Sequence, residues 1–331
     1  MNKIKFLRLK ILVIRFSSIG DIVLTSPVIR CLKNQIADAE IHFLTKEPYA
    51  EIVENNPNIS KVFTIKAYTD EVIALLKAEQ YDYIIDLHDN IRSRQVSAAL
   101  KSKTFRYNKQ RFRRFLLIRF KIDALHTHVV DRYFEAVSPL QVINDGNGLD
   151  FFIPEKGHLG AEKLPFTHIA GYCVIAIGTK HFTKTIPLQK LEELCQKISI
   201  PIILLGDMHD AYNGTQLEKI DNFKIYNACG KFSITQSASV IQRAKFVITG
   251  DTGMMHIAAA LNKRIISIWG GTDKRLGFYP YQNSSVNSVL IENTMLKCRP
   301  CSKHGLSACP KGHFNCMNQL DMQKVIAVIG K

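Results

Sequence analysis

The feature that most constrains the fold of this chain is a repeated alternation of short β-branched runs with helix-like segments, which covers most of its 331 residues. In the first half, the runs predicted to form strands are Ile11–Phe16, Ile41–Leu44, Val62–Ile65, Tyr83–Asp86 and Thr104–Arg106. Amphipathic stretches predicted to be helical lie between the early ones, at Ile22–Leu32 and Asp70–Leu76. Strands that alternate with helices in this way are typical of a parallel sheet covered on both faces.

The alternation is interrupted once and then restarts. Residues 144–148 (N-D-G-N-G) form a dense turn cluster, and Phe151–His168 has little periodicity. The second series is predicted to contain strands at Cys173–Ile177, Ile202–Leu205, Phe223–Tyr226, Phe246–Thr249 and Ile265–Trp269, and helices at Leu188–Ile198, Ile234–Arg243 and Met254–Leu261. We therefore predict an α/β protein of two doubly wound units joined near residue 150. The helical spacing of Gln319–Ile329 predicts a final helix that docks on one of them.

The sequence has no apolar run that approaches the roughly 20 residues of a membrane-spanning helix. Met1–Lys10 is basic and Ile11–Ile14 is apolar, as at the start of a secretion signal. Arg15 and Asp21 interrupt the apolar stretch too early for such a signal. We therefore expect a soluble, cytoplasmic protein.

Positive charge is concentrated in one stretch of the sequence. The chain has 44 Lys and Arg against 29 Asp and Glu, a formal net charge of +15 with His neutral, which favours anionic partners. Residues 101–121 contain nine basic residues, no acidic residue, and interleaved Phe, Leu and Ile. Such a segment can lie on an anionic membrane surface or hold a phosphorylated ligand. It can equally be a solvated helix edge beside a core stripe.

The eight cysteines fall into two groups. Four stand among apolar neighbours, as small core residues do: Cys31, Cys173, Cys195 and Cys229. Four more share one short stretch with the spacing C-x2-C-x7-C-x6-C, near two histidines: Cys298, Cys301, Cys309 and Cys316. A C-x2-C pair can place two thiolates on one tetrahedral ion, which would allow a structural zinc site. The alternative is a loop packed by reduced or redox-sensitive thiols.

The first candidate functional motif, R-F-S-S-I-G-D at residues 15–21, follows the first predicted strand and opens a helix. In a parallel α/β sheet the carboxyl end of a strand borders the binding crevice. Gly20 lets the backbone approach a ligand closely, and Asp21 places a carboxylate where it can act as general base for a hydroxyl group. Asp21 can equally be a residue that only caps the helix.

Two further motifs follow strands of the second half. The motif G-D-T-G-M-M-H, residues 250–256, opens a helix, and its free N–H groups with Thr252 could form a set of donors for a diphosphate, with His256 one turn later. The motif G-T-K-H-F-T-K, residues 178–184, has lysines that can hold phosphate, or is a solvated basic loop. Together with Asp21, these loops are typical of a nucleotide-sugar transferase cleft.

Residues 15–27 (R-F-S-S-I-G-D-I-V-L-T-S-P) and 251–261 (D-T-G-M-M-H-I-A-A-A-L), read with Thr183–Pro187, resemble the lipopolysaccharide heptosyltransferases, the family 9 glycosyltransferases of GT-B fold. The similarity extends from Ile11 to the cysteine-bearing tail. It implies two Rossmann-like domains that face each other across a cleft. Residues 1–150 would bind the acceptor and residues 165–317 the nucleotide sugar, and the C-terminal helix, 318–331, would cross back to the first domain.

The resemblance also implies an activity and a location. The reaction would be an inverting, metal-independent transfer of heptose from ADP-heptose to the inner core of lipopolysaccharide. It would take place at the cytoplasmic face of the inner membrane of a Gram-negative bacterium. ADP-heptose is then a substrate, no cofactor is expected, and the partners are a lipid A–Kdo or core oligosaccharide acceptor and an anionic membrane surface.

The matching positions carry roles over to this sequence. Asp21 matches the general base that deprotonates the acceptor hydroxyl, and Lys184 matches the lysine that neutralises the donor diphosphate. The residues expected to bind the donor are Ser18, Gly20, Thr183, Asp251, Thr252, Gly253, Met254 and His256. The basic stretch would meet the phosphorylated acceptor, and the residues expected there are Arg111, Arg113 and Arg114.

The sequence departs from the family pattern at one place, because the usual Lys-x-Trp-Pro reads K-T-I-P at residues 184–187. The resemblance gives no reason for the cysteine cluster. Three alternatives stay open: a GT-B transferase for another sugar or acceptor, a scaffold that binds a nucleotide sugar without turnover, and a basic nucleic-acid-binding protein. We expect no specific nucleic acid partner, because the chain lacks a helix-turn-helix or RNA-binding signature and has one tryptophan for stacking.

Overall fold

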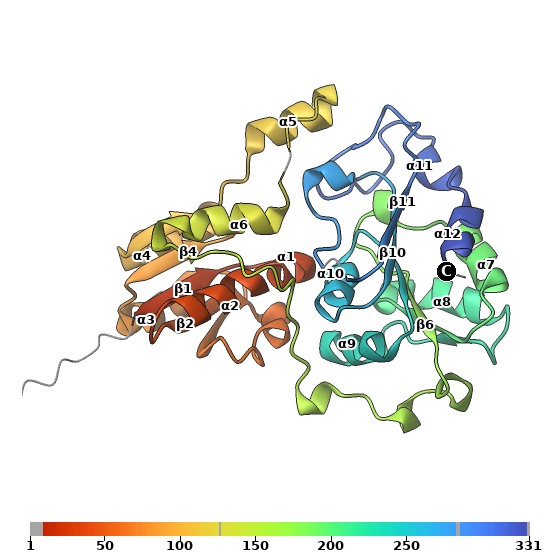
Figure 1. Cartoon of the computed structure of the whole chain (residues 1–331), viewed down its shortest axis with the longest axis horizontal. Helices are drawn as coiled ribbons and strands as arrows, with labels where there is room; N and C mark the ends of the chain where they lie inside the picture. Colours follow the sequence, from red (N-terminus) through yellow and green to blue (C-terminus); the bar gives the residue numbers. More distant parts are fainter. Residues whose placement is uncertain (1–8, 126, 283–284, 330–331) are drawn as a thin grey trace, which may run out of the picture. The chain divides into compact units, whose positions relative to one another are not determined.

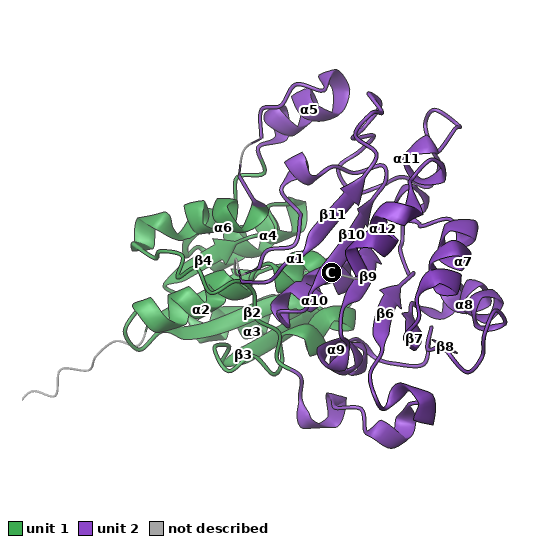
Figure 2. Cartoon of the chain, turned by 45° about the vertical axis from the view of Figure 1, so that its right-hand side comes forward, with its two compact units in different colours: residues 1–109, 129–152 green, residues 110–128, 153–331 purple. Residues whose placement is uncertain are grey.

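The computed structural model describes residues 9–125, 127–282 and 285–329, which form two compact units (Figures 1 and 2). Unit 1 comprises residues 1–109 and 129–152, and unit 2 comprises residues 110–128 and 153–331. Each unit contains one sheet in which every pair of neighbouring strands is parallel. The predicted α/β class with two parallel sheets is therefore confirmed.

The sheet of unit 1 has the strand order β3-β2-β1-β4-β5. Its strands are β1 (Lys10–Ile14), β2 (Glu40–Lys46), β3 (Lys61–Ile65), β4 (Tyr83–Asp86) and β5 (Lys103–Arg106). Its helices are α1 (Ile19–Val23), α2 (Ser26–Gln35), α3 (Asp70–Glu79), α4 (Ile91–Leu100) and α6 (Val129–Val137). Helix α3 contacts α4, and α2 contacts α6. The chain adds β2 and β3 on one side of β1, and β4 and β5 on the other side. Because crossovers between parallel strands are right-handed, the two helix pairs lie on opposite faces of the sheet.

The sheet of unit 2 has the order β11-β10-β9-β6-β7-β8, the doubly wound order of a six-stranded Rossmann sheet. Its strands are β6 (Cys173–Ala176), β7 (Ile202–Leu205), β8 (Ile225–Asn227), β9 (Val247–Gly250), β10 (Ile265–Trp269) and β11 (Val289–Glu292). The helices of unit 2 are α5 (Arg111–Phe120), α7 (Leu188–Lys197), α8 (Ala211–Glu218), α9 (Ile234–Arg243), α10 (Gly253–Ala260), α11 (Asn315–Asn318) and α12 (Met322–Ile329).

Both sheets are buried on their two faces, as the uninterrupted apolar runs predict. The central strands β1 and β6 are buried over nearly their whole length. The four cysteines predicted as core residues, Cys31, Cys173, Cys195 and Cys229, are all buried. In unit 1, the predicted turn cluster 144–148 is irregular and is held to α2 by Arg30, which pairs with Asp145 and Asp150.

The single helix expected over Ile22–Leu32 is wrong, because the structure breaks it into α1 and α2. The Thr25 hydroxyl donates to the Ile22 carbonyl oxygen at 2.7 Å, and the Ser26 hydroxyl donates to the Val23 carbonyl oxygen at 2.8 Å. These bonds occupy carbonyl groups at the end of α1. Pro27 has no N–H to continue the ladder and is favoured in the first turn of a new helix.

The C-terminal helix α12 packs in unit 2, and its return to the first domain stays a prediction. Within unit 2, α12 contacts α7 and β11, and its Met322 and Val325 belong to the apolar core of that unit. Arg264 further donates to the carbonyl oxygen of Val328. The apolar face of α12 is therefore buried by its own unit. Among the described residues, no helix is both long enough and apolar enough to span a membrane.

Candidate functional site

In unit 1, the sequence-predicted motif lies at the point where the strand order reverses. Strands β1 and β4 are neighbours there, and ligands of doubly wound sheets bind outside the carboxyl ends of such strands. Arg15, the residue directly after β1, is buried. Its Nη1 donates to the carbonyl oxygen of Leu87, after β4, at 2.5 Å, and its Nε donates to the carbonyl oxygen of Ser17 at 2.9 Å. Arg15 therefore joins the two loops at this position.

Asp21 lies in α1, with its carboxylate shared between two neighbours. Arg15 Nη2 is 2.7 Å from Oδ1 of Asp21. The backbone N–H of Ser18 and its hydroxyl both donate to Oδ2, at 3.2 and 2.9 Å. Asp21 therefore does cap α1, as the alternative interpretation has it. Capping does not exclude a second role, because a carboxylate can accept several hydrogen bonds and can also be protonated.

Arg15 sits among aromatic rings that fix its position. Its guanidinium carbon is 5.9 Å from the ring centre of Tyr133, which is edge-on to Tyr107 at 4.8 Å between ring centres. Burial lowers the pKa of Arg15, but Asp21, Tyr133 and Tyr107 outweigh it, and the pKa is raised overall. Arg15 is therefore a permanent cation beside the carboxylate of Asp21.

In unit 2, the corresponding position lies between β6 and β9, which are also neighbours where the strand order reverses. Lys184 ends the short 3-10 helix Phe182–Lys184 after β6, and Asp251 follows β9 directly. The Lys184 ammonium is 2.7 Å from Oδ2 of Asp251 and 3.0 Å from the Asp251 carbonyl oxygen. Two residues predicted separately, 67 positions apart, thus form one nearly buried ion pair.

Thr183 anchors the loop that carries Lys184. Its N–H donates to the carbonyl oxygen of Leu306 at 3.1 Å, and its hydroxyl accepts from the Leu306 N–H at 2.8 Å. Its own carbonyl oxygen accepts from Gly271 at 2.8 Å. Thr183, which the sequence predicts as a residue that binds the sugar donor, is buried. Its hydrogen bonds fix the loop that carries Lys184. A Cβ on Gly250 would lie 3.1 Å from the Lys184 carbonyl oxygen, which explains a glycine there.

The loop from β9 into α10 presents the remaining donor candidates. Thr252 is in extended conformation before the first turn of α10, and its hydroxyl is 3.1 Å from that of Thr249. Gly253 and Met254 are partly exposed in the first turn. His256, in the same helix, is only 4% exposed.

The local field around Lys184 is positive. Burial lowers the pKa of His181, Lys184 and Lys180 lower it further, and Asp251 acts in the opposite direction. Ile186, which stands where the family has tryptophan, is buried in the apolar core of unit 2. At this position the chain therefore has an aliphatic side chain of the core in place of an aromatic ring.

The predicted acceptor residues lie on α5. Arg111 and Arg113 are exposed, but Arg114 is only 7% exposed and faces inward with Leu117. Large apolar side chains on and beside the same helix are exposed instead: Phe112, Phe115, Phe120 and Ile122. The exposed surface of α5 is therefore both basic and aromatic.

Sequence reasoning overlooked Asp86, at the carboxyl end of β4. It is fully buried and accepts hydrogen bonds from the N–H groups of His88 and Asp89 and from the Ser93 hydroxyl, at 2.8–3.0 Å. Burial raises the pKa of Asp86, and these donors oppose the rise. The sequence does contain a sign of this residue, because Asp86 is the polar residue that ends an otherwise apolar strand. Asp86 shapes the loop whose Leu87 carbonyl binds Arg15.

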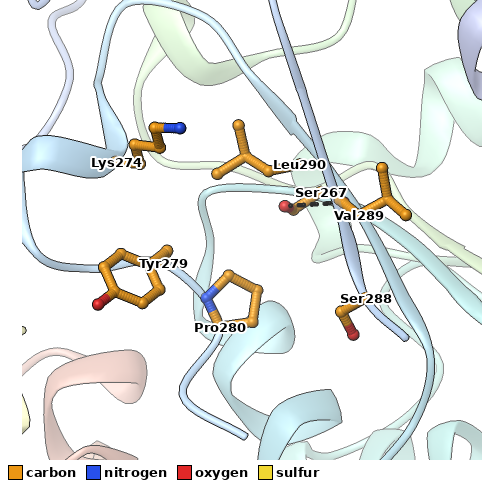
Figure 3. Close-up of a pocket in the computed structure, with 7 residues that line it drawn as sticks. All are labelled: Ser267, Lys274, Tyr279, Pro280, Ser288, Val289 and Leu290. Atoms are coloured by element: carbon orange, nitrogen blue, oxygen red, sulfur yellow. Dashed lines mark hydrogen bonds between the residues drawn. The ribbon is translucent and has the colours of Figure 1, made fainter. Parts of the chain in front are cut away.

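A separate cavity of about 230 Å³ lies in unit 2 beside β10 and β11 (Figure 3). Its lining is Ser267, Lys274, Tyr279, Pro280, Ser288, Val289 and Leu290. None of these is a predicted site residue, and the volume is below the roughly 300–1,000 Å³ of ligand pockets. We therefore place the candidate residues of unit 1 at the loop after β1, and those of unit 2 at the loops after β6 and β9 and not in this cavity.

Comparison with known proteins identifies the family of the chain. A sequence profile described as glycosyltransferase family 9 (heptosyltransferase) matches residues 71–306. The chain is 28% identical to "Lipopolysaccharide heptosyltransferase 1" of Campylobacter coli over 292 residues, 80% of this chain and 84% of that protein.

Two solved structures show the same fold. A family 9 glycosyl transferase from Veillonella parvula is 18% identical, with a TM-score of 0.79, over 99% of this chain and 98% of that one. The Escherichia coli heptosyltransferase WaaC with ADP-2-deoxy-2-fluoro heptose is 22% identical, with a TM-score of 0.68, over 97% and 99%. The predicted GT-B fold is thereby confirmed.

Proposed function

This chain belongs to glycosyltransferase family 9, the heptosyltransferases, and on that premise we propose that it transfers a heptose from ADP-heptose to the inner core of lipopolysaccharide. The observation that carries the proposal is the Lys184–Asp251 pair at the carboxyl ends of β6 and β9. It places a nearly buried ammonium group where a doubly wound sheet binds the phosphates of a nucleotide.

Unit 2 supplies the donor half of the proposed site. A diphosphate entering there competes with Asp251 for the Lys184 ammonium and meets the donors of the Thr252–Met254 turn. Both would stabilise the negative charge that develops on ADP as it leaves the sugar. Because Lys184 supplies positive charge at that place, we propose a transfer that needs no added divalent cation.

Unit 1 supplies the proposed base. The acceptor hydroxyl oxygen forms a bond to the anomeric carbon while the bond from that carbon to the ADP oxygen breaks. The hydroxyl proton passes to the Asp21 carboxylate. A single displacement of this kind inverts the anomeric centre. Arg15 and Ser18 hold the carboxylate in position throughout, through the contacts already described.

The direct test is transfer to a heptose-deficient lipid A–Kdo acceptor in buffer without added divalent metal. We expect release of ADP and a mass gain of one heptose, with the new glycosidic bond inverted relative to the donor by NMR. UDP-glucose serves as the control donor and should give no product. Binding of ADP-heptose without transfer would exclude this acceptor, and no binding at all would exclude the donor.

We further propose that α5 rests on the anionic membrane surface that carries the acceptor. Its exposed face combines Arg111 and Arg113 with three exposed phenylalanines, the most exposed being Phe112 at 71%. Aromatic side chains can enter the boundary between headgroups and acyl chains, and basic side chains bind anionic headgroups. Lys121 Nζ donates to the Pro300 carbonyl oxygen at 2.7 Å, which links the end of α5 to the cysteine-bearing segment of the same unit.

Vesicle binding checks the role of α5. The double variant Arg111→Ala/Arg113→Ala should bind vesicles of phosphatidylethanolamine and phosphatidylglycerol about 2 kcal/mol more weakly, because each cation near such a surface contributes about 1 kcal/mol. The matched control is Phe223→Ser, an exposed aromatic residue of unit 2 outside α5, which should bind as the unaltered protein does. Equal binding by the double variant and the control would count against the proposal.

A further inference from the structure

The four C-terminal cysteines lie in one segment of unit 2, and none of them forms a disulfide. Cys298, Cys301 and Cys309 are partly exposed, and Cys316, in α11, is buried. Burial raises the pKa of the Cys316 thiol to about 11. Arg299 opposes this rise, and the other three thiols add to it. Cys309 and Cys316 pack at the same apolar core of unit 2, although seven positions separate them in sequence.

The neighbourhood offers further features of a thiolate site. Nε2 of His313 is 4.0 Å from Sγ of Cys298, and Sγ of Cys301 is 3.6 Å from the Cys298 carbonyl oxygen. Two cations flank the cluster. Arg299 is buried, and Lys121 is close enough for Cys301 and Cys298 to affect its pKa, which burial lowers.

Another group of potential metal ligands serves as a contrast. Glu40, His42 and Glu79 have ligand atoms within 4.8 Å of one another, and no other such group of three occurs in the described ranges. Glu79, however, is 2.7 Å from Lys10 Nζ and 2.6 Å from Lys61 Nζ, so ammonium groups already neutralise it. The cysteine sulfurs are spaced more widely, and an ion bound by them would draw the loop together.

The cysteine-bearing segment is joined directly to the loop of Lys184. The N–H of Cys301 donates to the Gly271 carbonyl oxygen at 2.8 Å, and Gly271 in turn donates to Thr183. Leu306, between the second and third cysteines, exchanges hydrogen bonds with Thr183. Gly305 has a positive φ of 99°, and a Cβ there would lie 2.6 Å from Cβ of His181. Whatever fixes residues 298–316 therefore also fixes residues 181–184.

We propose that Cys298, Cys301, Cys309 and Cys316 bind one zinc ion as a closed four-thiolate site, which braces the loop that carries Lys184. Four thiolates with no open position are the ligand set of a structural zinc site. The C-x2-C spacing supplies one pair, and the two later cysteines supply the other. The metal site stands on the cysteines alone, and only its consequence for Lys184 rests on the proposed function.

Metal content and cobalt spectroscopy test the site without any transfer assay. Full-length protein from zinc-supplemented growth should contain about one zinc per chain by mass spectrometry of the metal. Cys301→Ser and Cys309→Ser should lose it, because each removes one partly exposed ligand. The matched control Cys31→Ala removes a buried thiol of unit 1 and should keep it. Metal-free protein titrated with Co²⁺ should show the thiolate-to-cobalt charge-transfer and d–d bands of a tetrahedral site.

Hydrogen exchange tests the brace. Removal of the metal should speed exchange of the Thr183 and Leu306 amides by roughly tenfold, because their mutual bonds are then held by the loop alone. Metal-free protein that gives no thiolate bands with Co²⁺ would overturn the proposal, even where a serine variant fails to fold. Iron in place of zinc, or equal metal loss in Cys31→Ala, would overturn it as well. Failure of heptose transfer with metal retained would bear only on the proposed function.

Discussion

Replacing Asp21 with asparagine (Asp21→Asn) is expected to lower kcat for heptose transfer by a factor of about 10²–10⁴, the usual contribution of a general base. Affinity for ADP-heptose should change little, because the donor diphosphate is assigned to unit 2. The amide has the shape of the carboxylate and can still accept a hydrogen bond from Ser18. It cannot take up the hydroxyl proton. Steady-state kinetics with donor binding by calorimetry measure the two effects separately.

The control for Asp21 must separate proton transfer from packing. Asparagine leaves the buried Arg15 guanidinium without its anionic partner, so stability will also fall and has to be measured by thermal unfolding. Ser18→Ala removes the 2.9 Å hydrogen bond to Oδ2 and keeps the carboxylate. It should cost about 1 kcal/mol, less than tenfold in rate. Similar kcat values for the two variants would mean that Asp21 only caps α1.

We expect the second large loss of activity when Lys184 is replaced with methionine (Lys184→Met). We expect kcat/KM for ADP-heptose to fall by about 10²–10³, because the ammonium is proposed to stabilise charge on the departing diphosphate. The methionine side chain keeps the unbranched stem and removes the charge. The matched control is Lys180→Met in the same loop, an exposed lysine that should lower kcat/KM by less than about threefold.

The free energy of unfolding provides a second test of the Lys184→Met variant. The substitution leaves the nearly buried Asp251 carboxylate without its partner, which typically costs about 3–5 kcal/mol. The double variant Lys184→Met/Asp251→Asn should recover most of that stability and none of the turnover. Recovery of turnover in the double variant would show that Lys184 acts only by neutralising Asp251. The pKa of His181, followed by NMR, should rise in Lys184→Met because one of the cations that lower it is gone.

Much of the fold could be predicted because it depends on local pattern. Runs such as 202–205 and 265–269 are strands with the predicted bounds, since a strand buried on both faces is a nearly continuous apolar run. Helix α9 was predicted with its bounds, and Ser233 and Gln236 cap it reciprocally, at 3.0 and 3.3 Å. Strand β11 was not predicted, because its apolar run is short and lies at the edge of the sheet.

The candidate site was predictable in its residues and not in its pairings. The motifs named Lys184 and Asp251 as donor residues, but no local pattern indicates that the two form an ion pair. That pairing depends on β6 and β9 being neighbours, which only the strand order decides. The same holds for Arg15, whose partner Leu87 follows β4. The burial of Arg114 and His256 could not be predicted either, because it depends on which helix face the rest of the unit covers.

The division of the chain into two units determines which fragments and chimaeras of this protein keep each unit whole. The backbone passes from one unit to the other three times, after residues 109, 128 and 152. A fragment that ends at 152 would carry the arginine-rich helix α5 without the rest of its own unit, and a fragment that ends at 109 would lack α6, which covers α2. A chimaera that exchanges the proposed donor-binding unit between relatives must therefore move residues 110–128 together with residues 153–331. The exchangeable module of this enzyme is discontinuous in its gene.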